Sequence, residues 1–145
     1  MREKQKSKRN VILWDVENIS YRYIDEVLYH ADEPSDIVLI SAKPLGEKMT
    51  YHLFPYMLLY GIKVYTDHDD SDARLVEFLY RHYREYKKVT IVSSDTDFVN
   101  PIKEVLGRKK PVRVIVMDDQ KKGMVMRLKL DRRGLDIRTI KRKKR

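Results

Sequence analysis

The chain has 145 residues, 42% of them hydrophobic, which is enough for one domain with a packed core and argues against global disorder. It has no cysteine, which excludes a disulfide framework and any thiolate metal site. No apolar run reaches the roughly 18 residues that span a bilayer, so we expect no membrane segment. These properties predict a soluble, cytoplasmic protein.

The formal charge of +9 is the balance of 31 basic and 22 acidic residues. The basic excess is concentrated at the two ends of the chain, in residues 1–9 and 141–145. We interpret these segments as basic tails that flank one domain of residues 10–140. Tails of this kind suit a polyanionic partner, and solvated ends that only aid solubility explain the same composition.

The first half of the chain alternates between short β-branched runs and helical periodicities. Strands are predicted at residues 11–14, 37–40 and 62–65. Two helices are predicted between these strands, one after a capping segment at residues 18–20 and one over about residues 47–60. We expect the second helix to bury Leu53, Met57 and Tyr60. Pro55 predicts a kink or a late start in that helix.

The second half continues the alternation. A helix is predicted over about residues 72–86, then a strand at 89–93, a helix that ends at Gly107, and a strand at 111–117. Residues 121–133 alternate like a strand, but we favour a helix there, before a last strand at 135–140. Strands that alternate with helices predict an α/β fold with a mostly parallel central sheet and helices on both faces.

Aspartates follow the predicted strands at the points where the strands end. The acids are Asp15, those of the run from Asp67 to Asp72, Asp95 with Asp97, and Asp118 with Asp119. The carboxyl ends of parallel strands lie along one edge of the sheet, where ligands bind in this type of fold. Crowded carboxylates raise one another's pKa unless a cation lies between them. The pattern therefore predicts a site for a hard cation such as Mg²⁺ or Mn²⁺.

Each acid also has a structural explanation, since aspartate is common at the N-terminus of a helix. Asp72 has more than this role, because it shares the inward-facing stripe of Leu75 and Leu79. Asp15 ends a buried strand with no immediate capping role. Asn18, one turn later, either orients Asp15 or caps the following helix. Asp118 and Asp119 either begin a turn or supply a fourth acid to the group of Asp15, Asp72 and Asp95.

Three segments together carry a resemblance to a known family. They are Val11–Asn18 (VILWDVEN), Ser71–Leu75 (SDARL) and Val92–Phe98 (VSSDTDF). These segments resemble the NYN domains, a branch of the PIN-like nucleases. One departure is a proline that follows the last motif one position later than is common in the family, as Pro101.

The resemblance implies a Rossmann-like sheet whose acidic cluster binds divalent metal and cleaves RNA. By position it makes Asp15, Asp72 and Asp95 metal ligands, Asp97 a supporting ligand, and Asn18 an orienting residue. We therefore expect a ribonuclease that depends on Mg²⁺ or Mn²⁺ and acts on RNA, single-stranded RNA in particular. A catalytically inactive RNA-binding module of the same fold is the alternative.

A third class, the Toprim and haloacid-dehalogenase phosphotransfer enzymes, also carries acids at strand ends. Toprim proteins have a glutamate at the first strand, where this chain has Asp15. Haloacid dehalogenases have Asp-x-Asp at the first strand, where Glu17 does not fit the second position. These placements disfavour the third class.

Overall fold

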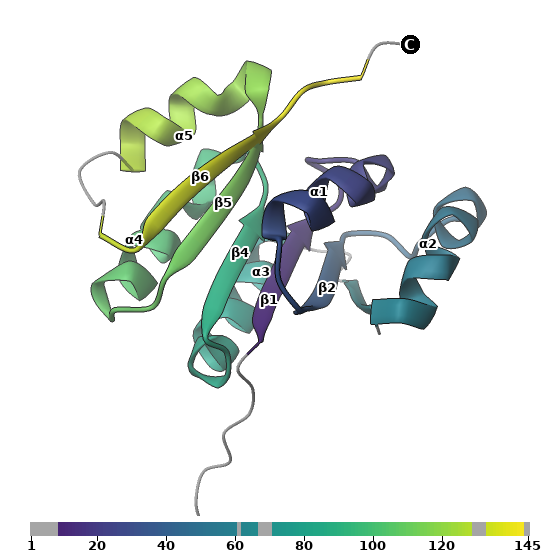
Figure 1. Cartoon of the computed structure of the whole chain (residues 1–145), viewed down its shortest axis with the longest axis horizontal. Helices are drawn as coiled ribbons and strands as arrows, with labels where there is room; N and C mark the ends of the chain where they lie inside the picture. The colour runs from purple at the N-terminus through teal and green to yellow at the C-terminus, as the bar shows by residue number, and fades with distance from the viewer. Residues whose placement is uncertain (1–8, 61, 67–70, 129–132, 144–145) are drawn as a thin grey trace, which may run out of the picture.

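The computed structural model describes residues 9–60, 62–66, 71–128 and 133–143. They form a six-stranded sheet in the order β3-β2-β1-β4-β5-β6, and every pair of neighbouring strands is parallel (Figure 1). The strands are β1 (Asn10–Asp15), β2 (Ser35–Ser41), β3 (Lys63–Thr66), β4 (Lys88–Val92), β5 (Val112–Met117) and β6 (Leu135–Ile140). This is the strand order of Rossmann-type sheets, and it confirms the predicted fold class.

The helices connect successive strands and cover both faces of the sheet. They are α1 (Ile24–Ala31), α2 (Glu47–Tyr60), α3 (Ser71–His82), α4 (Val99–Gly107) and α5 (Lys121–Leu128). Short 3₁₀ turns, η1 (Tyr21–Tyr23), η2 (Tyr83–Glu85), η3 (Thr96–Phe98) and η4 (Asp118–Gln120), adjoin four of them. No helix in the described ranges is both long and apolar enough to cross a membrane.

Alternate residues of each central strand supply two apolar cores. Val11 and Leu13 of β1 point to the core that contains residues of α3, α4 and α5, whereas Ile12 and Trp14 point to the core that contains residues of α1 and α2. This alternation follows from the two-residue period of a strand. Because both faces of β1 are covered, the run Val11–Trp14 is apolar without interruption, as expected for a strand of a parallel sheet.

Most predicted elements are confirmed. The ambiguous segment after β5 is helical at Lys121–Leu128, as we favoured, while residues 129–132 lie outside the described part of the chain. The helix predicted over residues 72–86 ends at His82 and continues as η2. Helix α2 begins at Glu47 with Pro55 inside it, so the late start was wrong.

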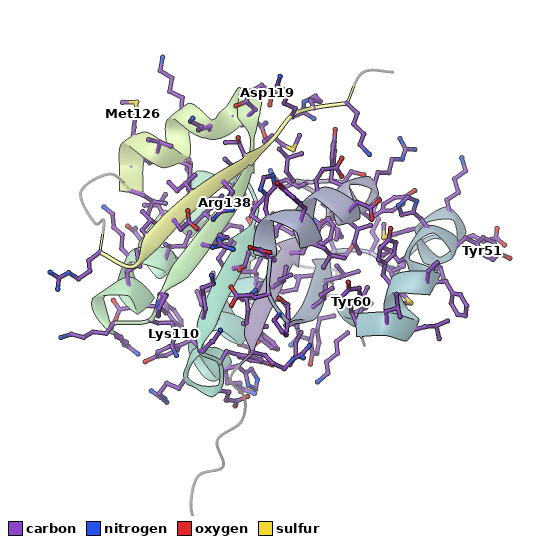
Figure 2. All side chains as sticks on the ribbon, in the orientation of Figure 1. Tyr51, Tyr60, Lys110, Asp119, Met126 and Arg138 are labelled. Atoms are coloured by element: carbon purple, nitrogen blue, oxygen red, sulfur yellow. The ribbon has the colours of Figure 1, made fainter. Side chains whose placement is uncertain are left out.

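The expected burial of Tyr60 was also wrong. Figure 1 shows α2 beyond β2, at one end of the sheet. Only Leu53 of the predicted stripe is fully buried, Met57 is partly buried, and Tyr60 is 37% exposed. The outward face of α2 carries further exposed apolar side chains, including Tyr51 (Figure 2). Helical spacing identified the residues that share a face of α2, but the described residues leave Tyr60 in its last turn partly uncovered.

The fold places the carboxyl ends of β1 and β4 side by side at the centre of the sheet. The chain runs outward from β1 to β2 and β3, then returns to β4 on the other side of β1. Such a reversal of strand order leaves a crevice beyond the carboxyl ends of the two central strands, and ligands bind there in open α/β sheets. The first and third sequence motifs meet at this position.

Candidate metal centre

Three carboxylates from separate segments converge at the crevice. Asp15 is the last residue of β1, Asp72 lies in the first turn of α3, and Asp95 follows β4. One carboxylate oxygen from each lies within 4.8 Å of the others. The sequence predicted these three as the strongest acids of the site. A role at the N-terminus of a helix could explain an acid taken singly, but it does not explain why the three carboxylates lie together.

Asp15 is the most buried of the three, with only 5% of its surface exposed. Its main-chain carbonyl accepts hydrogen bonds from the backbone N–H groups of Asn18 and Ile19, both at 3.1 Å. Its Oδ2 accepts a hydrogen bond of 3.2 Å from the Ser93 hydroxyl. The position of this carboxylate is therefore fixed by the loop that follows β1 and by the end of β4.

The environment of Asp15 opposes its negative charge. Burial and the nearby charge of Asp72 raise the pKa of the Asp15 carboxyl from 3.8 to about 6. The hydrogen bond from Ser93 acts in the opposite direction, and the charges of Asp95 and Glu17 add to the increase. A cation bound between these oxygens would reverse the penalty, because it would favour the ionised form of each carboxylate.

A serine pair joins the ends of three strands around the acids. Ser93 Oγ donates to Asp15 and accepts a hydrogen bond of 3.1 Å from the backbone N–H of Asp95. Ser94 Oγ accepts a hydrogen bond of 2.9 Å from the backbone N–H of Met117, at the end of β5. Ser93 thus links two of the three acids through one hydroxyl group, and Ser94 ties the loop that carries Asp95 to β5.

Asn18 lines the same crevice but does not cap the following helix. Its Oδ1 accepts a hydrogen bond of 2.7 Å from the backbone N–H of Ser94. Ser20 instead caps η1, the 3₁₀ turn that leads into α1, because its hydroxyl accepts a hydrogen bond of 3.1 Å from the backbone N–H of Arg22. Asn18 therefore holds the loop after β1 against the loop after β4, so that it affects the position of Asp95 as well as that of Asp15.

The remaining predicted acids lie outside the group of three. Asp97 is exposed, and its backbone N–H donates to Asp95 Oδ1 at 2.9 Å, so Asp95 caps η3. A carboxylate has two oxygens, and a cap made by one of them is compatible with metal binding by the other. A supporting role for the Asp97 side chain stays a prediction. Asp67, Asp69 and Asp70 lie outside the described residues.

Asp119 has a different partner. Its carboxylate accepts hydrogen bonds of 2.7 Å and 3.1 Å from Nε and Nη2 of Arg142 (Figure 2 labels Asp119). The hydrogen bonds from Arg142 lower the pKa of the Asp119 carboxyl. The structure therefore assigns Asp119 to an ion pair with the segment after β6. Asp118, the other candidate for a fourth acid, is exposed and also lies outside the group of three.

Glu17 is the acid that the sequence interpretation missed. An open pocket of ≈ 210 Å³ is lined by Asp15, Glu17, Asn18, Ser71, Asp72 and Asp95. Glu17 is exposed, and its charge contributes to the raised pKa of Asp15. The signal was present, because Glu17 lies between Asp15 and Asn18 in the first motif. Spacing alone could not show that the loop turns this side chain back toward the crevice.

The donor set of this pocket suits a hard divalent cation. Carboxylate and amide oxygens are the ligands that Mg²⁺ and Mn²⁺ prefer, and Mg²⁺ is commonly held by one or two carboxylates together with waters. The open shape of the pocket leaves room for such waters and for a phosphate. Among the described residues that line the pocket, none has a basic side chain.

An α/β domain of this topology, with acids at the carboxyl ends of its central strands, has the architecture of the PIN-like nucleases. The family model of the NYN domain matches residues 9–132, and the chain therefore belongs to the NYN domain family. A protein of unknown function from Vibrio parahaemolyticus, VPA0982, has a similar crystal structure, with a TM-score of 0.69 and 15% sequence identity. The match covers 96% of each chain and shows a shared fold. No curated protein matches the chain.

Proposed function

We propose that the protein is a metal-dependent ribonuclease that hydrolyses RNA phosphodiester bonds at the carboxyl edge of its sheet. The observation that carries this proposal is the convergence of Asp15, Asp72 and Asp95 to within 4.8 Å. Membership of a nuclease-type family supports it. A cytoplasmic location is part of the proposal, since a chain without cysteine has no need of an oxidising compartment.

Each residue of the centre has a definite task in this proposal. Asp15, Asp72 and Asp95 would hold Mg²⁺ or Mn²⁺, with Glu17 and Asp97 as supporting acids. A bound ion would lower the pKa of a water molecule and neutralise charge on the phosphate. Ser93 orients the Asp15 carboxylate, and Asn18 holds the two acid-bearing loops together. Asp15 binds a proton in the absence of metal at low pH, so acid competes with metal for this residue.

The basic tails complete the proposed enzyme. We assign residues 10–140 to the catalytic domain and residues 1–9 and 141–145 to phosphate-binding tails. Lysine and arginine contacts with the backbone give affinity that depends on salt and little on sequence. The C-terminal tail follows β6, whose end lies on the same edge of the parallel sheet as the acids. The tail is therefore attached on the side where the substrate would bind.

Cleavage of a labelled single-stranded RNA with Mn²⁺, Mg²⁺ or EDTA tests the proposal. We expect cleavage with a divalent ion and none in EDTA. Asp95→Asn should lower the cleavage rate by more than about 100-fold. Residues that only hydrogen-bond to a metal ligand typically contribute up to about 100-fold, and the loss of a ligand itself should cost more. Asp32→Asn is the matched control, since Asp32 is exposed at the end of α1 and should leave the rate unchanged.

The same samples separate the enzyme from the inactive alternative. RNA that is bound but not cleaved, with any divalent ion, would support the RNA-binding module and end the enzyme proposal. Metal binding is measured independently by thermal unfolding. An ion at about 100 times its dissociation constant should stabilise the wild type by about 2.7 kcal/mol. Asp15→Asn should fold normally and lose most of this stabilisation.

A further inference from the structure

Helix α3 carries a second pocket that the metal centre does not use. The helix begins beside the acids with Asp72 and packs against β1 and β2, and its Phe78 lies near Tyr65 of β3. A cavity of ≈ 120 Å³ lies between the helix and this strand. It is lined by Tyr65, Arg74, Glu77, Phe78, Arg81 and His82, and we call it the α3 flank pocket. Its volume is below the roughly 300 Å³ of pockets that enclose a whole drug-sized ligand, so it suits one ring of a larger molecule.

The flank pocket and the metal centre lie on adjoining sides of the same helix. Asp72 shares the sheet-facing stripe of Leu75 and Leu79, which are both buried. Residues 74, 78, 81 and 82 follow the three-and-four spacing of a neighbouring stripe. Phe78 is six residues beyond Asp72, which corresponds to about 9 Å along the helix axis. A nucleotide next to one bound at the acids could therefore reach the pocket.

Aromatic rings form much of the pocket. The ring centroids of Tyr65 and Phe78 are 5.8 Å apart, and those of Phe78 and His82 are 4.4 Å apart. All three side chains are partly exposed, although Tyr65 and Phe78 also pack against the core. Partly exposed aromatic faces are the usual platforms for unpaired bases, because every base has a π-face that can stack.

Two guanidinium groups, those of Arg74 and Arg81, line the pocket together with these rings. The guanidinium carbon of Arg74 lies 5.7 Å from the centroid of the Tyr65 ring. The Nε atom of Arg74 is buried and has no hydrogen-bond partner among the described residues. Arg74 and Arg81 both pair with Glu77, at 3.4 Å and 3.7 Å, and the side chain of Arg81 is 68% exposed. Two cations against one carboxylate leave a net positive charge, and exposed pairs of this kind are weak enough for a phosphate to displace.

We propose that the α3 flank pocket is a nucleotide subsite that accepts an unpaired base of single-stranded RNA and its phosphate. This inference rests on the proposed function. The base stacks on the ring of Phe78, and Arg74 and Arg81 bind the adjoining phosphate. Bases within a duplex are stacked on each other and cannot enter, so the subsite selects single strands.

Fluorescence anisotropy in EDTA tests this subsite without any cleavage. The probes are a labelled 12-nucleotide single-stranded RNA and a duplex of the same length. Phe78→Leu keeps an apolar side chain against the core and removes the stacking ring. It should weaken single-strand binding roughly fivefold to hundredfold, the range for one base–aromatic stack, with no change for the duplex. Phe54→Leu, which removes an exposed ring from α2, is the matched control and should bind like the wild type.

Arg81→Gln is a second variant that does not threaten the fold, because the side chain is mostly exposed. It should weaken single-strand binding and reduce the slope of log affinity against log salt by about 1, as expected for one lost phosphate contact. Arg127→Gln on α5 is its control. Single-strand affinity that changes no more in Phe78→Leu and Arg81→Gln than in their controls would overturn the subsite, as would an equal loss for the duplex.

The outcome is distinct from that of the cleavage assay. If the wild type binds single strands through this pocket but never cuts them, the subsite stands and the ribonuclease proposal falls. If the wild type cuts RNA and the pocket variants bind as their controls do, the enzyme stands and the subsite falls. Failure of the wild type to bind single-stranded RNA in EDTA would overturn the subsite, and the cleavage assay with a divalent ion would decide the ribonuclease proposal separately.

Discussion

Strand β1 has a buried polar side chain at each end, and the two side chains have opposite surroundings. Asn10 at its start and Asp15 at its end are both buried polar side chains. Asn10 donates to Ser35 Oγ on β2 and accepts from Thr90 Oγ1 on β4, both at 3.0 Å. Its amide thus links three neighbouring strands with neutral hydrogen bonds. Asp15 instead faces other acids, and its pKa is raised to about 6.

This difference separates stability from function within one element. A buried amide with hydrogen-bond partners contributes to folding, and its presence needs no further explanation. A buried carboxylate that faces Asp72 and Asp95 destabilises the fold when it is ionised. Such a residue suggests a task that stability does not explain. This contrast can be tested at Asp15, at Asn10 and at the tails attached to the two edges of the sheet.

The largest effect is expected from pH. The pKa of Asp15 rises from 3.8 to about 6 on folding, so between these pH values the folded protein binds more protons than the unfolded chain. Stability therefore falls as pH rises from 4 to above 6, by about 3 kcal/mol from this residue. Asp15→Asn should remove this loss, and guanidinium unfolding of both proteins without metal at pH 4, 5, 6 and 7 measures it.

The quantity to compare across pH is the difference in free energy of unfolding between the wild type and Asp15→Asn. Acids such as Asp119, whose pKa is lowered by its hydrogen bonds to Arg142, have the opposite pH dependence and are common to both proteins. Asp15→Asn should be more stable than the wild type at pH 7 and close to it at pH 4. Equal stability of the two proteins at pH 7 would show that Asp15 is not destabilising when ionised.

A smaller effect of the opposite sign is expected at the other end of β1. Asn10→Ala leaves the hydroxyl of Thr90 without its acceptor and that of Ser35 without its donor. The free energy of unfolding should be about 2 kcal/mol lower than that of the wild type. This difference from the wild type should be the same at every pH between 4 and 7. The stabilisation by Mn²⁺ should stay as in the wild type. A change in metal affinity would contradict the separation of the two ends.

The smallest effect concerns the two tails. Arg9 precedes β1 at the amino edge of the sheet, where it pairs with Asp36, and residues 141–143 follow β6 at the carboxyl edge. Deletion of residues 141–145 should lower the slope of log RNA affinity against log salt by about 1 or 2. Deletion of residues 1–8 is the comparison and should lower the slope less, because that tail is attached at the edge opposite the acids. Equal changes would show that the edge of attachment is irrelevant.

Much of the site was predictable because a strand defines where its last residue lies. Uninterrupted β-branched runs identified buried parallel strands, and parallel strands bring Asp15 and Asp95 to one edge. The inward stripe of α3 then predicted the direction of Asp72. These inferences need only the two-residue and 3.6-residue periods, and local sequence carries both.

Loop residues and the margin of the sheet were harder to predict. The hydrogen bond from the backbone N–H of Ser94 to Asn18 joins loops that are 76 residues apart. The position of Glu17 depends on the same loop geometry, and neither follows from spacing along the chain. The predicted burial of Tyr60 was wrong for another reason. A helical stripe shows which residues share a face of the helix, but not whether another element covers that face.

The order of the strands has a consequence for biosynthesis. Asp15 and Asp72 are synthesised before β4, which pairs with β1 and brings Asp95 to the crevice. A nascent polypeptide that still lacks β4 therefore has only two of the three carboxylates, and its first strand can pair only with β2. In the proposed ribonuclease, the three metal-binding carboxylates would therefore come together only after β4 has been synthesised and has paired with β1.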